Sequence, residues 1–390
     1  MNGGVHGPLS GIQVIEFCTV AAGPFCGMLL ADLGADVIKV EHPRGDSMRS
    51  WPPLTEGYSE NFASVNRNKR SVTLDMKQPE QQRFARELVM GADAVIENNR
   101  PGVMRRLGLD YPVFRALKPS LVYCSISAFG QQGPRAEEGG FDLTLQAMSG
   151  IMSVTGEPDG PPIKCGVPLT DFSAGLYGAM AVCAALRQVA IGGMGAHIDV
   201  PMLGTSLAIA ALQMSEFFGS GKNPGKLGSA HPRNAPYQAF EARDGHVAVA
   251  AGNDGLWASF CRALGREDLL DDARFASTGL RATNQRALKI LLDEDFVSRT
   301  VQQLLALFRK AGVPCAPINN YSEALLDEQV VAMAWVKEID LPNGNGALTF
   351  GSPLRFVGEE LPIYRNPPAL GEHDHEILDP LRRRLSGLEG

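Results

Sequence analysis

Positive charge and paired cysteines are both scarce in this sequence of 390 residues. Its 36 lysine and arginine residues are outnumbered by 43 aspartate and glutamate residues, so the formal net charge is −7. Because duplex nucleic acids are bound through a basic surface, this balance argues against a nucleic acid as the main partner. The seven cysteines are an odd number without a C-x-x-C pair, which predicts neither a zinc site nor a disulfide framework. Scattered cysteines within apolar runs are typical of buried residues in a reducing compartment.

The sequence also lacks a long uninterrupted apolar run. Its most apolar stretch, residues 174–190, contains Gly175, Gly178 and Arg187 and is shorter than the roughly 20 residues that a membrane-spanning helix needs. The opening M-N-G-G-V-H-G-P-L-S-G has no basic segment followed by an apolar one, so no secretory signal is expected. These features predict a cytoplasmic protein that does not enter a membrane.

Common nucleotide-binding and hydrolase motifs are absent. The loop at residues 18–24 reads C-T-V-A-A-G-P instead of G-x-G-x-x-G, which disfavours NAD even though Glu41 follows the next predicted strand. Neither a P-loop lysine motif nor a G-x-S-x-G elbow occurs. The segment 373–375, H-D-H, has no evident third ligand, so a solvated polar segment is favoured over a metal site. We therefore expect no bound metal.

The first half of the chain does contain an alternation of short apolar strands and helices. The predicted strands are residues 12–17, 36–40, 71–74, 94–96, 121–126 and 198–200, and the predicted helices are 24–33, 79–90, a long one from near Asp171, and 203–218. Hydrophobic residues make up 44% of the sequence, enough for a sizeable core. Strands that alternate with helices predict an α/β fold whose parallel sheet is covered on both faces.

The second half has a different pattern. Residues 219–236 hold few apolar side chains and many glycines and prolines, which is typical of a linker. Apolar segments at 237–240 and 246–250 flank R-D-G, a hairpin pattern. Helical patterns follow at residues 256–264, 281–292 and 301–310. These patterns predict a smaller α+β unit, after which the chain returns to the first domain from about residue 336.

Asp171 is placed where a carboxylate meets the start of an apolar helix, in G-V-P-L-T-D-F-S-A-G. An aspartate there usually caps the helix, and the pattern alone favours that role. Small residues follow at Ser173, Ala174, Gly175 and Gly178. They would leave space for a ligand to approach closely, which a capping residue does not require.

Two polar clusters adjoin predicted strands. One is N-R-N-K-R at 66–70, and the other is E-N-N-R-P-G at 97–102, followed by Arg105 and Arg106. A solvated basic loop is the ordinary interpretation of each. Ligands of open α/β sheets bind at strand ends, however, so the two clusters are also candidates to hold a phosphorylated ligand.

Taken together, these motifs resemble the class III CoA-transferase family, which includes formyl-CoA:oxalate and carnitine CoA-transferases. The likeness covers nearly the whole chain in collinear order. Its segments are G-I-Q-V-I-E-F at 11–17, A-A-G-P at 21–24, L-G-A-D-V-I-K-V-E-H-P at 33–43, N-K-R-S-V-T-L-D at 68–75, E-N-N-R-P-G at 97–102, G-F-D-L at 140–143, T-G-E-P-D-G-P-P at 155–162, residues 166–175, and G-E-H at 371–373.

The resemblance implies that Asp171 is the catalytic aspartate and that CoA is a substrate, with no metal or redox cofactor. Attack on a donor thioester would give a mixed anhydride and then an aspartyl–CoA thioester, which an acceptor acid reverses. The resemblance also implies contacts to the adenosine, phosphates and pantetheine of CoA. The matching residues are Val20, Glu41, His42, Lys69, Arg70, Asn98, Asn99 and Arg106. His42 replaces an arginine of the formyl-CoA enzyme.

The α-methylacyl-CoA racemases are similar to this chain as well. They use a histidine base within G-H-D, where this sequence has Gly140-Phe141-Asp142. Phenylalanine does not carry a proton, so two-base racemisation would lose one base. A racemase therefore stays the less favoured alternative, as does a non-catalytic CoA-binding subunit.

The acceptor acid is predicted from one difference from the oxalate-specific members of the family and from three arginines. Oxalate-specific members carry a glycine run in the small domain, where this chain has A-G-N-D-G at 251–255, so oxalate and formyl substrates are disfavoured. We expect a dicarboxylic acceptor with succinyl-CoA as a donor. Arg49, Arg135 and Arg233 are the candidates to hold the second carboxylate.

The resemblance finally implies the architecture. A Rossmann-like large domain of residues 1–218 and 331–390 would surround a linker at 219–236 and a small domain at 237–330. Members of the family form homodimers whose chains interlock like rings, and the same assembly is predicted here.

Overall fold

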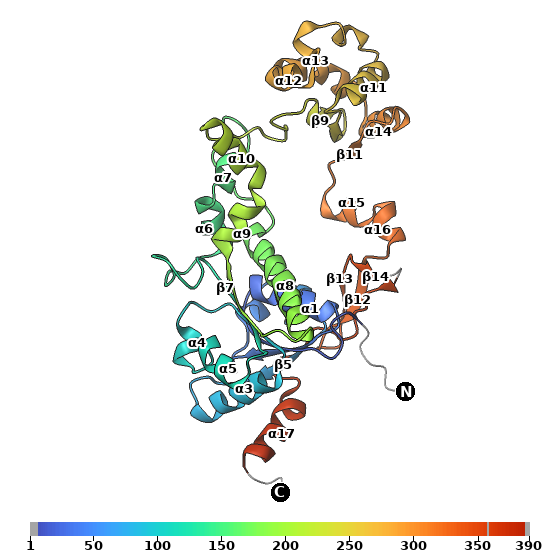
Figure 1. Cartoon of the computed structure of the whole chain (residues 1–390). Coiled ribbons are helices and arrows are strands. Elements are labelled where there is room, and N and C mark those ends of the chain that lie inside the picture. Colours follow the sequence, from blue (N-terminus) through green and yellow to red (C-terminus); the bar gives the residue numbers. More distant parts are fainter. Residues whose placement is uncertain (1–6, 357–358, 387–390) are drawn as a thin grey trace. The chain divides into compact units, whose positions relative to one another are not determined.

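A computed structural model describes residues 7–356 and 359–386 (Figure 1). The chain forms two compact units. The first comprises Met1–Ile151, Lys164–Lys222 and Val330–Gly390, and the second comprises Met152–Ile163 and Asn223–Gln329. Residues 1–6, to which the prediction of no secretory signal partly refers, lie outside the described residues.

The first unit is built on a six-stranded sheet with the order β5-β2-β1-β6-β7-β8. All neighbouring strands are parallel. The strands are β1 (Gln13–Phe17), β2 (Asp36–Glu41), β5 (Lys69–Thr73), β6 (Ala94–Glu97), β7 (Val122–Ser127) and β8 (His197–Pro201). This confirms the predicted α/β class with a parallel sheet. The order reverses direction between β1 and β6, and crevices for ligands form at the carboxyl ends of such strands.

Both faces of this sheet are buried, as the continuous apolar strands require. Val14 of β1 joins one core with helices α1 and α8, whereas the next residue, Ile15, joins the other core with α3 and α17. These helices are α1 (Ala22–Asp32), α8 (Leu169–Ala190), α3 (Pro79–Gly91) and α17 (Asp374–Leu385). Figure 1 shows α1 and α8 on one side of the sheet and α3, α5 and α17 on the other.

The rest of the first unit consists of shorter elements. They are η1 (Ser47–Ser50), β3 (Leu54–Thr55), β4 (Tyr58–Ser59), α2 (Glu60–Ser64), α4 (Val103–Arg106), α5 (Tyr111–Leu117), α6 (Asp142–Met148), α9 (Met202–Ile209), α10 (Ala211–Ser220), β12 (Val336–Asp340), β13 (Gly346–Phe350), β14 (Arg355–Phe356) and β15 (Glu359–Glu360); α7 (Ile151–Val154) and α16 (Glu328–Ala332) lie at the unit boundaries. The helix predicted at 203–218 is two helices, because the chain leaves the helical conformation at Ala210.

The second unit contains an antiparallel sheet with the order β11-β10-β9, packed on helices. Its elements are β9 (Tyr237–Ala242), β10 (Gly245–Ala250), α11 (Asp254–Leu264), η2 (Glu267–Leu269), η3 (Ala273–Phe275), α12 (Thr278–Thr283), α13 (Gln285–Val297), α14 (Val301–Lys310), β11 (Cys315–Pro317) and α15 (Tyr321–Leu325). The predicted hairpin is present, with Ala242 paired to Gly245. The helix predicted at 281–292 is interrupted at Asn284, whose side-chain amide donates to the carbonyls of Leu280 and Arg274.

Helix α8 is, among the described residues, the one helix long and apolar enough to cross a membrane by length and composition. Nearly half of its most apolar window is buried inside the protein. Gly175 brings it close to α1, since a Cβ atom there would lie 2.8 Å from the Ala22 carbonyl oxygen. These contacts are those of a core helix, and soluble proteins commonly contain such helices.

Candidate active site

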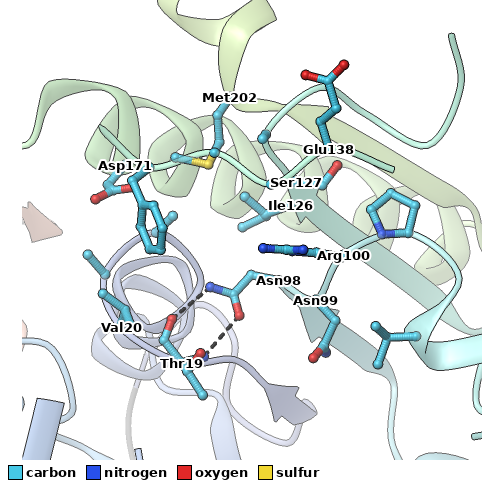
Figure 2. Close-up of a pocket in the computed structure, with 18 residues that line it drawn as sticks. Thr19, Val20, Asn98, Asn99, Arg100, Ile126, Ser127, Glu138, Asp171 and Met202 are labelled. Atoms are coloured by element: carbon cyan, nitrogen blue, oxygen red, sulfur yellow. Dashed lines mark hydrogen bonds between the residues drawn. The ribbon is translucent and has the colours of Figure 1, made fainter. Parts of the chain in front are cut away.

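A pocket of about 390 Å³ opens at the carboxyl ends of β1, β6 and β7, beside the point where the strand order reverses (Figure 2). All of its lining belongs to the first unit. The walls come from the loop after β1 (residues 19–22), the loop after β6 (residues 98–101), residues 138–141 and the first turn of α8. The sheet topology thus brings together segments that are far apart in sequence.

Asp171 reaches this pocket from the first turn of α8. It is not the cap that the pattern favoured, because the helix already begins at Leu169 with Pro168 before it and no side-chain cap. Burial, together with the negative charge of Asp142, raises the pKa of Asp171 to about 7. A poorly solvated carboxylate with a raised pKa is more basic than an exposed one and is suited to nucleophilic attack.

Asp142 is held firmly next to this carboxylate. Its side chain accepts hydrogen bonds from the backbone N–H of Thr170 (3.0 Å), the Thr170 hydroxyl (2.9 Å) and the Gln146 amide (2.8 Å). These bonds fix the start of α6 to the start of α8, where Asp171 lies. Sequence reasoning used Asp142 as part of the G-F-D-L motif and to weigh a racemase, and it missed the electrostatic effect of Asp142 on Asp171.

The small residues after Asp171 do not make room for a ligand. Ser173, Ala174, Gly175 and Gly178 are all buried, and the two glycines face α1 and the sheet. A Cβ atom at position 178 would lie 3.2 Å from the Cys26 sulfur. The space that was attributed to a ligand is therefore occupied by helix α1.

The loop after β1 carries Val20, which lines the pocket in a left-handed conformation with φ 66°. A β-branched residue rarely adopts this conformation, so other contacts must hold it. Its backbone N–H donates to both carboxylate oxygens of Asp46, at 3.2 and 3.1 Å. Asp46 in turn forms an ion pair with Lys39, 3.1 Å away, which is fully buried and also pairs with Glu16.

Asn98 and Asn99 line the same pocket from the loop after β6. Asn98 exchanges two hydrogen bonds with the backbone of Thr19, at 2.9 and 2.8 Å, as the dashed lines in Figure 2 show. The Asn99 amide donates to the Phe17 carbonyl oxygen. Both side chains therefore join the loops after β1 and β6 and shape the wall of the pocket.

The two basic clusters lie at opposite ends of the parallel strands, one at the amino ends and one at the carboxyl ends. This differs from the expectation that both adjoin the ligand crevice. Residues 97–102 follow the carboxyl end of β6, whereas residues 66–70 precede or open β5 at its amino end. Lys69 is fully buried, with its ammonium 2.8 Å from Glu16 and donating to the Pro24 carbonyl. Arg70 pairs with Asp36 and Glu376. Neither side chain lines the pocket, and their predicted contacts to CoA stay predictions.

The other predicted CoA residues lie outside the pocket lining as well. Glu41 is buried at the end of β2, and although burial disfavours its charge, Arg49 and Lys39 hold its pKa below the usual value. His42 is exposed directly after β2, and its ring accepts from the backbone N–H of Arg44. Arg106 is exposed at the end of α4.

Two of the three arginines predicted to hold a second carboxylate pair with acidic side chains, and neither of these two lines the pocket. Arg49 donates to both oxygens of Glu41, at 2.8 and 2.6 Å, and to the Pro368 carbonyl. Arg135 is exposed and pairs with Glu138 at 3.0 Å. Arg233 belongs to the second unit. The pocket instead contains Arg100, which the E-N-N-R-P-G motif includes but which sequence reasoning did not select.

The H-D-H segment is not the solvated tail that was favoured. The His373 ring accepts from the backbone N–H of Ser71 at 3.2 Å, and Asp374 accepts from the backbone N–H of Thr73 at 2.7 Å. These bonds attach α17 to the edge strand β5. His375 is exposed and pairs with Asp379. Within the described residues no group of three or more histidine, cysteine or acidic side chains is placed to hold a metal ion.

Comparison with known proteins identifies the class to which this fold and site belong. The sequence profile described as CoA-transferase family III matches residues 9–374, so the chain belongs to CoA-transferase family III. It is similar to the succinate–glutarate CoA-transferase of Agrobacterium fabrum, with 40% identity over 96% of each chain. The succinyl-CoA:glutarate CoA-transferase of Mus musculus is 36% identical over 97% of this chain and 88% of its own length.

A solved structure agrees over the whole fold. The crystal structure of a CAIB/BAIF family protein from Brucella suis is 41% identical, covers 96% of this chain and 99% of its own, and gives a TM-score of 0.85. These findings confirm the resemblance seen in the motifs. The chain is a family III CoA-transferase, and its relatives support transfer of CoA between carboxylic acids.

Proposed function

We propose that this enzyme moves CoA from succinyl-CoA or a similar acyl-CoA to a dicarboxylic acid through an aspartyl–CoA thioester on Asp171. The observation that carries the proposal is the placement of Asp171, a poorly solvated carboxylate in a pocket at the sheet's ligand crevice. The names of the relatives, which refer to succinate and glutarate, support dicarboxylic substrates.

The proposed steps balance without a net proton. A carboxylate oxygen of Asp171 attacks the donor carbonyl, the C–S bond breaks, and CoA thiolate leaves a mixed anhydride. The thiolate attacks the aspartyl carbonyl, which releases the donor acid and forms the aspartyl–CoA thioester. The acceptor carboxylate attacks that thioester, and the freed thiolate then takes the acceptor acyl group and restores Asp171. Backbone N–H groups of the lining segment Gly139–Gly140 are candidates to stabilise the oxyanions.

A racemase is disfavoured by the composition of the pocket. Two-base racemisation needs a second proton carrier across the substrate from the carboxylate. The position that would supply it is Phe141, whose side chain is 73% exposed beside the pocket. No histidine is present among the residues that line the described pocket. A racemase would exchange the α-proton of a branched acyl-CoA in heavy water without any acceptor acid, which we expect this enzyme not to do.

A homodimer is part of the proposal, and so is a cytoplasmic location. Large apolar side chains are exposed along α8 and α10, namely Leu176, Met180, Leu212 and Phe218. An apolar surface of this kind on a soluble enzyme is typical of an interface between subunits. A second copy of the chain is the partner that the resemblance implies.

The mechanism is tested by mass spectrometry of the protein after incubation with succinyl-CoA, glutaryl-CoA and butyryl-CoA. We expect a CoA adduct on the Asp171 peptide, converted by hydroxylamine to a hydroxamate, and no adduct in Asp171→Asn. Asp340→Asn is the matched control, because Asp340 is exposed on β12 away from the pocket. If the Asp171 peptide stays unmodified while CoA binds, a non-catalytic CoA-binding subunit replaces the proposal.

A further inference from the structure

Three charged side chains line the pocket, and two of them have evident roles or partners. Asp171 is the proposed nucleophile. Glu138 pairs with Arg135 at 3.0 Å. The third is Arg100, whose guanidinium makes no hydrogen bond or ion pair within residues 7–356 and 359–386. A cation without a partner in a substrate pocket is suited to an anionic group of the ligand.

The backbone around Arg100 sets the direction in which its exposed side chain leaves the loop. Pro101 follows it and restricts its backbone to extended conformations. Its carbonyl accepts from the backbone N–H of Val103 at 3.1 Å, and Gly102 between them adopts φ 85°. The loop thus turns sharply after the carboxyl end of β6 and directs Arg100 into the pocket beside Asn98 and Ile126 (Figure 2).

Gly139 provides the surface against which the guanidinium lies. A Cβ atom at position 139 would fall 2.6 Å from Nη2 and 2.9 Å from Cζ of Arg100. Any other residue there would displace the guanidinium. The planar group of Arg100 is therefore seated on a glycine backbone and keeps its N–H donors available to the pocket.

The other basic side chains near the carboxyl ends of the strands either pair with acidic groups or, like the exposed Arg106, lie outside the pocket lining. Arg49 is held by Glu41, and Lys39 and Lys69 are fully buried with Glu16. Arg135 is paired outside the pocket lining. A second carboxylate that enters the pocket would meet the negative charges of Asp171 and Asp142, so it requires a cation. Among the described residues that line the pocket, Arg100 is the one basic side chain.

We propose that Arg100 binds the distal carboxylate of the dicarboxylic substrate while the near carboxyl group reacts at Asp171. This inference rests on the proposed function and adds the residue that determines its substrate class. The donor thioester and the acceptor carboxylate must each bring a carboxyl carbon to the same aspartate in turn. Their distal carboxylates therefore occupy the same position, and one arginine serves both halves of the reaction. Planar guanidinium binds a carboxylate through two parallel hydrogen bonds, which sets orientation as well as affinity.

The test compares acceptors that differ only in the distal charge. Glutarate is compared with pentanoate and with monomethyl glutarate, using the full-length enzyme and succinyl-CoA or butyryl-CoA as donor. The variants are Arg100→Gln, Arg100→Lys and Gly139→Ala. Arg105→Gln is the control, because Arg105 lies in the same part of the chain and is exposed but does not line the pocket.

We expect Arg100→Gln to lower kcat/KM for glutarate by roughly 100-fold, the value of a lost charged hydrogen-bond pair. The kcat/KM for pentanoate should change less than about threefold, so the ratio of kcat/KM for glutarate to that for pentanoate should fall sharply. Gly139→Ala should lower the same preference by displacing the guanidinium, although Arg100 itself is intact. Arg105→Gln should keep the wild-type preference.

Three results would overturn the inference. One is an equal loss of kcat/KM for glutarate and for pentanoate in Arg100→Gln, if that loss disappears when a succinyl thioester without phosphate groups replaces the CoA donor. That result would assign Arg100 to a phosphate of CoA. Another is a wild-type enzyme without preference for dicarboxylates, and the third is an unchanged preference in Arg100→Gln. Trapping of the Asp171 adduct separates these results from failure of the proposed function. With butyryl-CoA as donor, Arg100→Gln should still form that adduct.

Discussion

The chemistry of this enzyme depends on how two aspartates are placed at the residue scale. Asp171 is poorly solvated, and its carboxylate accepts no hydrogen bond within residues 7–356 and 359–386, whereas Asp142 accepts three hydrogen bonds at 2.8–3.0 Å. Hydrogen bonds to a carboxylate favour its charged form, and burial disfavours it. The two groups therefore differ in role although they are the same type of side chain, and the charge of Asp142 makes Asp171 more basic.

The pH dependence of the first half-reaction follows from this arrangement. Asp171 must be ionised to attack, and its pKa is about 7. We expect kcat/KM for succinyl-CoA to be about tenfold lower at pH 6 than at pH 8, because only a minor fraction of Asp171 is ionised at pH 6. In Asp142→Asn the neighbouring charge is lost, so the pKa of Asp171 should fall and the deficit at pH 6 should shrink.

The measurement is kcat/KM between pH 5.5 and 9 for the wild type and Asp142→Asn, with circular dichroism to confirm folding at each pH. A midpoint that does not move in the variant would contradict the role assigned to Asp142. A profile that is flat from pH 5.5 to 8 would contradict the raised pKa of Asp171 itself.

The helix pair α1 and α8 decides the position of the catalytic residue at the element scale. Both helices are apolar nearly all round, as is typical of elements covered by others. Gly175 permits their close approach, and the loop that precedes α1 carries Val20 in a strained conformation held by Asp46. The pocket wall is therefore built by backbone contacts between elements and not by one motif.

Substitution of Gly175 tests that contact. A Cβ atom there would lie 2.8 Å from the Ala22 carbonyl and 2.9 Å from the Phe25 ring. Overpacking of this kind costs roughly 1–3 kcal/mol, whereas replacing glycine by alanine within a helix gains only about 0.5–1 kcal/mol. We expect Gly175→Ala to lower the free energy of unfolding in a urea titration.

Gly279→Ala is the matched control for this substitution. Gly279 also lies within a helix, α12, but a Cβ atom there would meet no heavy atom within 4 Å. The control should therefore raise the free energy of unfolding by about 0.5–1 kcal/mol. If both glycine variants stabilise the protein, the close approach of α1 and α8 does not limit stability.

At the scale of the whole molecule, the exposed apolar side chains of α8 and α10 require an explanation that the single chain does not supply. Leu176, Met180, Leu212 and Phe218 are between 54% and 76% exposed. Such side chains are usually covered in a stable homodimer, whose interface is more apolar than the rest of the surface. The predicted dimer would bury them.

Light scattering after size-exclusion chromatography tests this prediction. We expect the wild type to have twice the mass of one 41.8 kDa chain at micromolar concentration. The double variant Met180→Glu with Phe218→Glu should shift the equilibrium toward monomers, because buried charge without a partner is costly. Lys310→Glu, a change of charge on the exposed end of α14, is the control and should leave the mass unchanged. A monomeric wild type would contradict the dimer.

The alternation of short apolar strands with helices was sufficient to predict the parallel sheet, because periodicity is a local property of the sequence. Motifs such as E-N-N-R-P-G and the segment around Asp171 were sufficient for the family, since they record residue types at fixed spacing. The breaks at Ala210 and Asn284 were missed because helix periodicity continues through them.

Only the tertiary structure decided which side chains meet. It placed residues 66–70 at the amino ends of the parallel strands and residues 97–102 at their carboxyl ends, since one cluster precedes its strand and the other follows it. In the folded protein the small residues after Asp171 pack against helix α1, and Arg49 pairs with Glu41. Arg100 lines the pocket instead. Burial and the pairing of charges depend on contacts between residues distant in sequence. A pattern along the chain therefore identifies the residue types of a site, and the fold determines which of them are free to act.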